Sequence, residues 1–119
     1  LFTFVFVTTI VAKDVPELLP LPSYLDKQLG ASIRLACSVA DGSLPINFVW
    51  TRNGKVIDHQ HLIESKDFAS TLIIKNISIE DSGNLTCTAQ NRFGLDVQWS
   101  YLTLKGFSRR CLNILVLRS

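Results

Sequence analysis

Two cysteines and one tryptophan restrict the folds open to this chain more than any other feature. Cys37 and Cys87 lie 50 residues apart, and Trp50 follows the first of them by 13 residues. Each of the three falls on the apolar side of a segment in which apolar and polar residues alternate, the pattern of a half-buried strand. A disulfide that joins two sheets packed about 10 Å apart needs inward-facing cysteines in the middle of both. The spacing therefore predicts two sheets bonded through Cys37 and Cys87, with Trp50 filling the centre; the alternative is two unrelated buried thiols.

The remaining segments indicate more strands of the same kind. Alternation recurs across residues 33–39, 46–51, 70–77, 85–90 and 95–104. Turn-forming clusters separate these segments, namely Asp41-Gly42-Ser43, Asn53-Gly54, Asp81-Ser82-Gly83 and Asn91 to Gly94. Residues 58–67 form a polar stretch, and no segment of ten residues has the helical period. About seven short strands with turns every eight to twelve residues predict an all-β sandwich.

The two ends of the chain differ from this pattern. Residues 1–12 are an apolar run that is too short to span a bilayer and matches the hydrophobic part of a secretory signal peptide, cut after Ala12; a β-strand is the alternative. Residues 13–30 hold three of the four prolines, which indicates an edge strand or an extended lead-in. Residues 107–119 are expected to be a linker or a gene-model tail in which Cys111 is unpaired. The predicted domain therefore covers residues 13–106.

Charge and chemistry exclude several classes of function. The net charge is +2, but three of the 12 basic residues lie in the last thirteen positions, so the domain offers no basic field for nucleic acid or acidic lipid. His59 and His61 form the only histidine cluster, with Glu64 alone nearby, whereas a metal site needs three or four ligands. No Gly-rich phosphate loop and no marked serine–base pair is present. We therefore expect no enzyme activity, no cofactor, no metal and no small-molecule substrate.

Three stretches in the second half of the chain carry a family resemblance. Residues 72–77, 81–87 and 89–94 together resemble the second half of an intermediate-set (I-set) immunoglobulin domain. The resemblance implies a two-sheet immunoglobulin-like sandwich with Greek-key connections, in which Cys37 and Cys87 form the inter-sheet disulfide and Trp50 is the core tryptophan. One position departs from the family. Leu85 stands two residues before the second cysteine, where a tyrosine usually ties down the preceding corner, so that hydrogen bond is expected to be lost.

A narrower resemblance concerns the first half of the domain. Residues 29–30, 37–39, 44–46 and 50–54 are similar to modules of invertebrate Down syndrome cell adhesion molecule-like proteins, which are multi-domain neuronal and surface receptors that bind copies of themselves. This implies an extracellular adhesion module, on the plasma membrane or secreted, that recognises protein, including itself, in neuronal wiring or axon guidance. The alternatives are a secreted or immune-type receptor fragment with heterologous partners, and the ectodomain of a receptor kinase.

Two asparagines fit the acceptor pattern for N-glycosylation. They are Asn76, in Asn76-Ile77-Ser78, and Asn84, in Asn84-Leu85-Thr86. Both flank the turn between two predicted strands, where side chains are expected to reach water. We predict that they carry glycans; the alternative for each is an ordinary exposed asparagine.

The last predicted strand has apolar residues of both parities. Val97, Trp99 and Tyr101 share one parity, while Leu102 and Leu104 have the other. A bulge would turn Trp99 into the core. Without one, the first three residues lie on the outer face beside residues of neighbouring strands, including Val49 and Thr88. An exposed aromatic patch on a sheet is suited to binding protein. We therefore name these residues as the candidate binding face, and the opposite sheet, around Arg34, Thr71 and Ile73, as the alternative.

Overall fold

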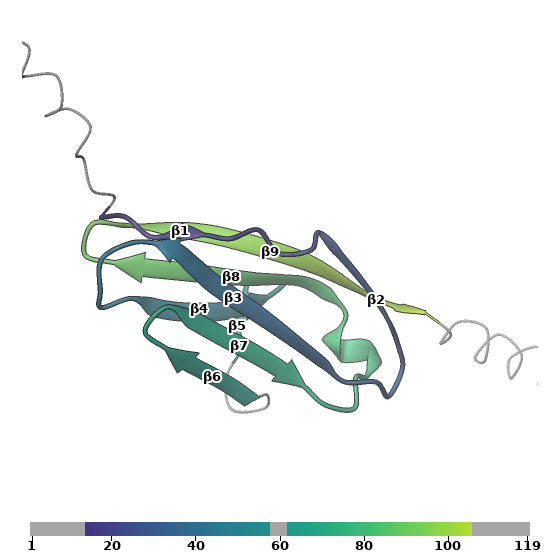
Figure 1. The fold of residues 1–119 in the computed structure, drawn as a ribbon. Coiled ribbons are helices and arrows are strands. Elements are labelled where there is room, and N and C mark those ends of the chain that lie inside the picture. The colour runs from purple at the N-terminus through teal and green to yellow at the C-terminus, as the bar shows by residue number, and fades with distance from the viewer. Residues whose placement is uncertain (1–13, 58–61, 106–119) are drawn as a thin grey trace, which may run out of the picture.

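The structure is a computed structural model that describes residues 14–57 and 62–105, and it is built almost entirely of strands (Figure 1). In chain order the elements are β1 (Glu17–Leu18), β2 (Tyr24–Gln28), β3 (Ile33–Asp41), β4 (Asn47–Arg52), β5 (Lys55–Val56), β6 (Leu62–Lys66), β7 (Ala69–Ile74), the 3₁₀ helix η2 (Ile79–Asp81), β8 (Gly83–Asn91) and β9 (Gly94–Lys105). No helix in these two ranges is long and apolar enough to cross a membrane.

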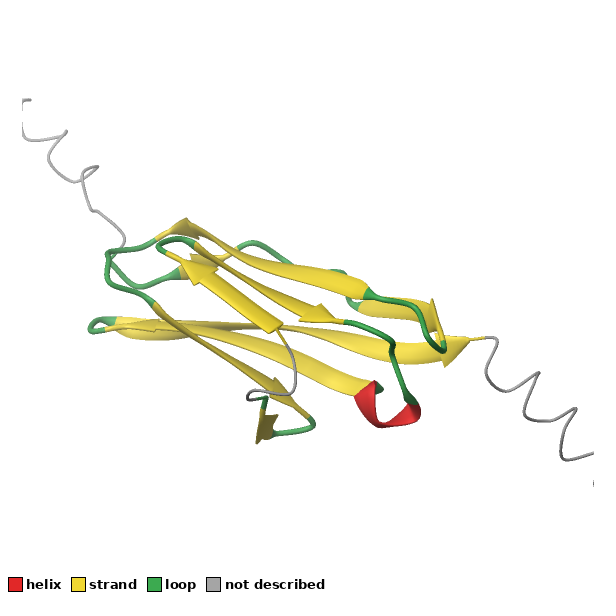
Figure 2. Cartoon of the chain, turned by 90° about the horizontal axis from the view of Figure 1, so that it is seen from below, coloured by secondary structure: helices red, strands yellow, loops and turns green. Residues whose placement is uncertain are grey.

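The strands form two sheets that pack face to face (Figure 2). One sheet has four strands in the order β1-β3-β7-β6, and the other has five in the order β2-β9-β8-β4-β5. The chain changes sheet at five connections, namely β1–β2, β2–β3, β3–β4, β5–β6 and β7–β8, so sequence neighbours are divided between the layers. The prediction of an all-β, two-sheet sandwich is confirmed.

The proline-rich lead-in supplies an edge strand to each sheet. β1 pairs with β3, and after the chain crosses over, β2 pairs with β9 in the parallel direction, with Tyr24 opposite Tyr101. Prolines lie between and before these strands, at 16, 20 and 22, where a missing N–H breaks no ladder hydrogen bond. Because the lead-in covers an edge of both sheets, it closes one side of the sandwich.

The predicted disulfide lies in the centre of the core and is confirmed. Cys37 in β3 is bonded to Cys87 in β8 with an S–S distance of 2.08 Å, and both residues are fully buried. Trp50 is directly opposite Cys87 in the β4–β8 register and is also buried. Its indole Nε1 donates a hydrogen bond of 2.9 Å to Oγ of Ser70, which satisfies the one polar atom of the ring. The disulfide and the tryptophan therefore join strands of both sheets.

The corner before β8 is held without a tyrosine. Leu85 is fully buried and fills the core at that position. The carboxylate of Asp81, in η2, accepts a 2.7 Å hydrogen bond from the backbone N–H of Ser78 and a 3.4 Å one from Nη1 of Arg52 in β4. A charge-assisted hydrogen bond to a buried carboxylate is a strong tie. Asp81 thus fixes the corner where the family tyrosine is missing.

One strand lies in the stretch that was predicted only to be polar. β6 is an edge strand and pairs with β7, placing Leu62 opposite Ile73. Its outward residues include Glu64 and Lys66, and charged side chains on an edge strand oppose pairing with another chain. Because of these charged residues, the segment shows no clear alternation of apolar and polar residues, so the sequence did not predict a strand there. His59 and His61 lie outside the described residues.

A candidate protein-binding face

Strand β9 turns Trp99 outward. β8 and β9 pair without interruption from Gly83 opposite Leu102 to Asn91 opposite Gly94, so the pairing contains no bulge. Ser100 and Leu102 point into the core and are fully buried, whereas Trp99, next to Ser100, is 51% exposed. The alternative in which a bulge turns Trp99 inward is therefore wrong.

Polar residues on the inner side of β9 explain this orientation. Oδ2 of Asp96 accepts a 2.8 Å hydrogen bond from the backbone N–H of Leu18, and Oε1 of Gln98 accepts one of 3.3 Å from that of Leu21. These inward side chains satisfy backbone donors of the lead-in, which crosses this half of the strand. By the rule of alternation, an Asp and a Gln on the same parity as Leu102 would suggest the opposite direction for the strand, so the sequence alone could not settle it.

Exposed apolar side chains collect on the outer face of the five-stranded sheet. Trp99 is opposite Thr86, Val97 is opposite Thr88, and Thr88 is in turn opposite Val49, so the predicted set forms one continuous area. Tyr24, Val56 and Leu95 extend it and were missed by sequence reasoning, because they lie in the lead-in, in a two-residue strand and at a turn. We call this area the aromatic face; its exposed large apolar residues are Tyr24, Val49, Val56, Leu95, Val97, Trp99 and Tyr101.

The aromatic face is neutral at its centre and charged at one end. The central strand neighbours of Trp99 and Val97 are threonines. Beyond Tyr101, Nζ of Lys105 lies 3.8 Å from Oδ2 of Asp26, and Oγ1 of Thr103 donates to the same carboxylate. These exposed charges already have partners, so little net charge remains on the face.

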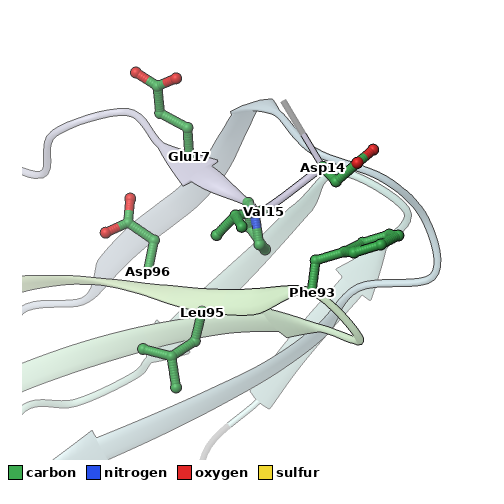
Figure 3. Close-up of a pocket in the computed structure, with 7 residues that line it drawn as sticks. Asp14, Val15, Glu17, Phe93, Leu95 and Asp96 are labelled. Atoms are coloured by element: carbon green, nitrogen blue, oxygen red, sulfur yellow. The ribbon is translucent and has the colours of Figure 1, made fainter. Parts of the chain in front are cut away.

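A separate open hollow lies between the lead-in and the β8–β9 turn (Figure 3). Val15 and Phe93 border it, and the Arg92 guanidinium carbon lies 4.8 Å from the Phe93 ring centroid. Two of its carboxylates serve the structure: Asp96 accepts from two backbone N–H groups, and Asp14 accepts from Oγ of Ser43. Within the described ranges, no three His, Cys, Asp or Glu side chains are grouped as metal ligands. The hollow therefore marks the place where the lead-in packs against the β8–β9 hairpin.

The two sequon asparagines have different surroundings. Asn76 is exposed in the turn after β7, with a left-handed φ of 55°. Asn84 is partly exposed in β8 and lies opposite Tyr101, on the aromatic face. Glycosylation of either remains a prediction.

Comparison with protein families identifies the domain. A family model described as "Immunoglobulin domain" matches residues 16–91. The chain therefore belongs to the immunoglobulin domain family, as the spacing of Cys37, Trp50 and Cys87 indicated. The I-set subtype remains a prediction.

Curated relatives contain modules similar to this domain. Cell adhesion molecule DSCAML1 of Mus musculus is 36% identical over 83 residues, which are 68% of this chain and 4% of the relative. Contactin-4 of Rattus norvegicus is 38% identical over 88 residues, covering 68% of this chain and 9% of the relative. The chain thus spans less than a tenth of these relatives. Its immunoglobulin domain is therefore similar to one module of these much longer proteins, the first of which is named a cell adhesion molecule.

Solved structures agree with the fold. The Ig7 domain of Dscam1, isoform 9, superposes with a TM-score of 0.69 at 22% identity, covering 75% of this chain and 98% of that one. The M1 domain from titin gives a TM-score of 0.69 at 18% identity, covering 76% of this chain and 95% of that domain. At these identities the likeness concerns the fold alone.

Proposed function

We propose that this immunoglobulin module is an extracellular recognition unit of a cell-adhesion protein, secreted or on the plasma membrane, and that it binds a second copy of itself through the aromatic face. The observation that carries the proposal is the exposure of Trp99 at the centre of a continuous apolar area. Leaving apolar surface in water costs roughly 25 cal/mol for each Å². Large exposed aromatic side chains at the centre of a patch are typical of binding hot spots.

The lack of charge on the aromatic face favours a second, equally neutral copy over a strongly charged partner. Around Trp99, the strand neighbours Thr86, Thr88 and Val49 are uncharged, so two copies of the face can meet without repulsion. A two-fold arrangement lets one patch serve as both sides of the interface. A strongly charged partner would find no complementary groups there.

The position of the chain ends suits a string of such modules. The segment before β1 and the end of β9 lie at opposite ends of the sandwich, so neighbouring modules could follow one another without covering the aromatic face (Figure 1). One module pair is expected to be weak, about micromolar, and several modules in series would add avidity. Recognition between identical surface proteins is the type of event used in neuronal wiring and axon guidance, which we propose as the setting.

Sedimentation velocity of the purified 119-residue chain tests the proposal. We expect reversible self-association at micromolar to millimolar concentration, and Trp99→Ala should weaken it at least roughly tenfold, the effect of a hot-spot residue. Thr71→Ala, on the outer face of the other sheet, is the matched control and should associate like the wild type. A chain that stays monomeric throughout would exclude a second copy as the partner and favour a heterologous one. Weakening by Thr71→Ala alone would move the interface to the four-stranded sheet.

A further inference from the structure

The second sequon opens onto one end of the aromatic face. Asn84 is directly opposite Tyr101 in the β8–β9 register, and Tyr101 is opposite Tyr24 in β2. We propose that an N-linked oligosaccharide on Asn84 packs on the Tyr24–Tyr101 pair, so that the protein's own glycan, and no protein partner, covers this end of the face. This packing of the glycan goes beyond the self-recognition proposed above and does not depend on it.

The backbone of Asn84 is held in a fixed position. Asn53, in the β4–β5 turn, donates its N–H to the carbonyl oxygen of Asn84 at 2.9 Å, and its Oδ1 accepts the N–H of Asn84 at the same distance. The preceding Gly83 has a φ of 131°, and a β-carbon there would overlap the Asn53 side chain. These contacts fix the direction in which the Asn84 side chain leaves the strand. A glycan attached there therefore begins in a defined place on the face.

The Asn84 amide is available for attachment. In the part of the chain that the structure describes, no hydrogen bond engages its side chain, whereas its backbone groups are bonded to Asn53. The side chain is partly exposed and lies on the same side of the sheet as Thr86, the third residue of the sequon. The outward parity of β8 thus presents the acceptor and the threonine together.

The tyrosine pair is a suitable platform for a sugar. The rings of Tyr24 and Tyr101 are stacked, with centroids 6.4 Å apart and planes inclined by 17°. Directly opposite residues in an antiparallel pair have β-carbons about 5 Å apart, so the first sugar residue on Asn84 reaches the Tyr101 ring. The C–H-bearing face of a pyranose packs well on an aromatic ring, because its partly positive hydrogens meet the negative π face. The two phenol hydroxyls can bond to sugar hydroxyls at the rim.

The first sequon lacks such a platform and supplies the control. Asn76 is exposed in a turn, and its Oδ1 lies near Gly30. Among the described strand registers, none pairs Asn76 with an aromatic residue, as β8–β9 pairs Asn84 with Tyr101. The hydroxyl of Ser78, the third residue of that sequon, donates to Asp81 at 3.2 Å. A glycan on Asn76 is therefore expected to extend into solvent.

A glycan packed on Tyr24 and Tyr101 also reduces the area through which two copies of the domain can associate. Only this consequence rests on the proposed function. Covering Tyr24 and Tyr101 leaves the half of the face with Val49, Val97 and Leu95 for a protein partner. Asn84→Gln should then increase self-association severalfold relative to the glycosylated chain. If neither the glycosylated wild type nor Asn84→Gln self-associates, the proposed self-recognition is overturned. The packing of the glycan on the tyrosines is not affected by that result, because it is measured on the monomer.

Thermal unfolding of four proteins from a secretory host tests this packing of the glycan. The wild type, Asn84→Gln, Tyr101→Thr and the double variant are compared by circular dichroism, after mass spectrometry has established glycan occupancy at Asn84. We expect loss of the glycan to lower Tm by roughly 3–6 °C when Tyr101 is present and by about 1 °C or less in the Tyr101→Thr background. The same four proteins made without glycans in bacteria correct for effects of the substitutions themselves. Tyr24→Thr repeats the test from the other ring.

Two control variants show whether the coupling is specific to the Asn84 glycan and Tyr101, and either of two outcomes would overturn the proposal. Asn76→Asp, which keeps a residue tolerant of the left-handed conformation, should show no coupling with Tyr101→Thr. Val97→Thr, on the same strand and face, should show none with Asn84→Gln. The proposal is overturned if Asn84 carries no glycan in the secreted chain, or if removing its glycan lowers Tm equally with and without Tyr101. Upfield ring-current shifts of the sugar protons in the wild type, lost in Tyr101→Thr, would support it directly.

Discussion

The outer faces of the two sheets obey the same alternation but present different surfaces. The five-stranded sheet exposes Trp99 and two tyrosines with neutral neighbours. On the four-stranded sheet Leu62 is exposed at the edge strand, but the central Ile73, between Arg34 and Leu62, is only 7% exposed. Long charged side chains can cover apolar surface with their stems. The same fold therefore makes one face a solvated surface and leaves the other able to bind.

Removing the disulfide should have the largest effect, because both faces depend on the bond between the sheets. Cys37→Ala is expected to cost about 2–5 kcal/mol, as is typical when a small secreted domain loses a native bridge, and to prevent folding at body temperature. Urea unfolding of the oxidised wild type and the variant measures this loss. A variant with unchanged stability would show that packing alone joins the two faces.

A second prediction separates buried from exposed residues on outer faces. Ile73→Ala is expected to destabilise the domain by about 2 kcal/mol, because Ile73 is buried although it points away from the sandwich. Self-association should not change. Urea unfolding and sedimentation of the same variant test both halves of the statement. A loss of association greater than the loss of stability would make the four-stranded sheet the binding surface.

Ser100 allows a sharper test, on the inner side of the strand that carries the aromatic face. It is fully buried, and its hydroxyl has no hydrogen-bond partner within the described residues. Ser100→Ala removes this unsatisfied group and is expected to stabilise the domain by about 1 kcal/mol. Thermal unfolding measures the gain. A loss of similar size would mean that the hydroxyl is satisfied in solution.

The smallest effect on stability is expected for a substitution of Trp99, which precedes Ser100 in β9. Trp99→Ala should change the free energy of unfolding by about 0.5 kcal/mol or less, because the ring lies on the surface and contributes mainly cross-strand contacts with Thr86. Circular dichroism should show an unchanged fold. If this variant unfolds, the indole belongs to the packing of the domain and the aromatic face loses its centre.

Sequence reasoning reached the fold because its main signals are local or covalent. Alternation with period two is visible in any strand that has one wet face, and the spacing of Cys37, Trp50 and Cys87 restricts how such strands can pack. The strand β6 was not predicted, because an edge strand with charged residues resembles a loop in composition. Tyr24 escaped for a related reason, since the surrounding prolines indicated a lead-in without telling which sheet it would join.

The sequence by itself thus determined the class of the fold, the cysteine pair and the central tryptophan. Only the tertiary structure decided which way β9 faces, because both parities of that strand carry apolar residues and the choice depends on the lead-in that crosses over Asp96 and Gln98. It also placed Asn84 opposite Tyr101, residues 17 positions apart whose proximity follows from the register of a hairpin. Register is set by the turn and by burial of the opposite face, and a slip of one residue would move every side chain of the strand to the other side.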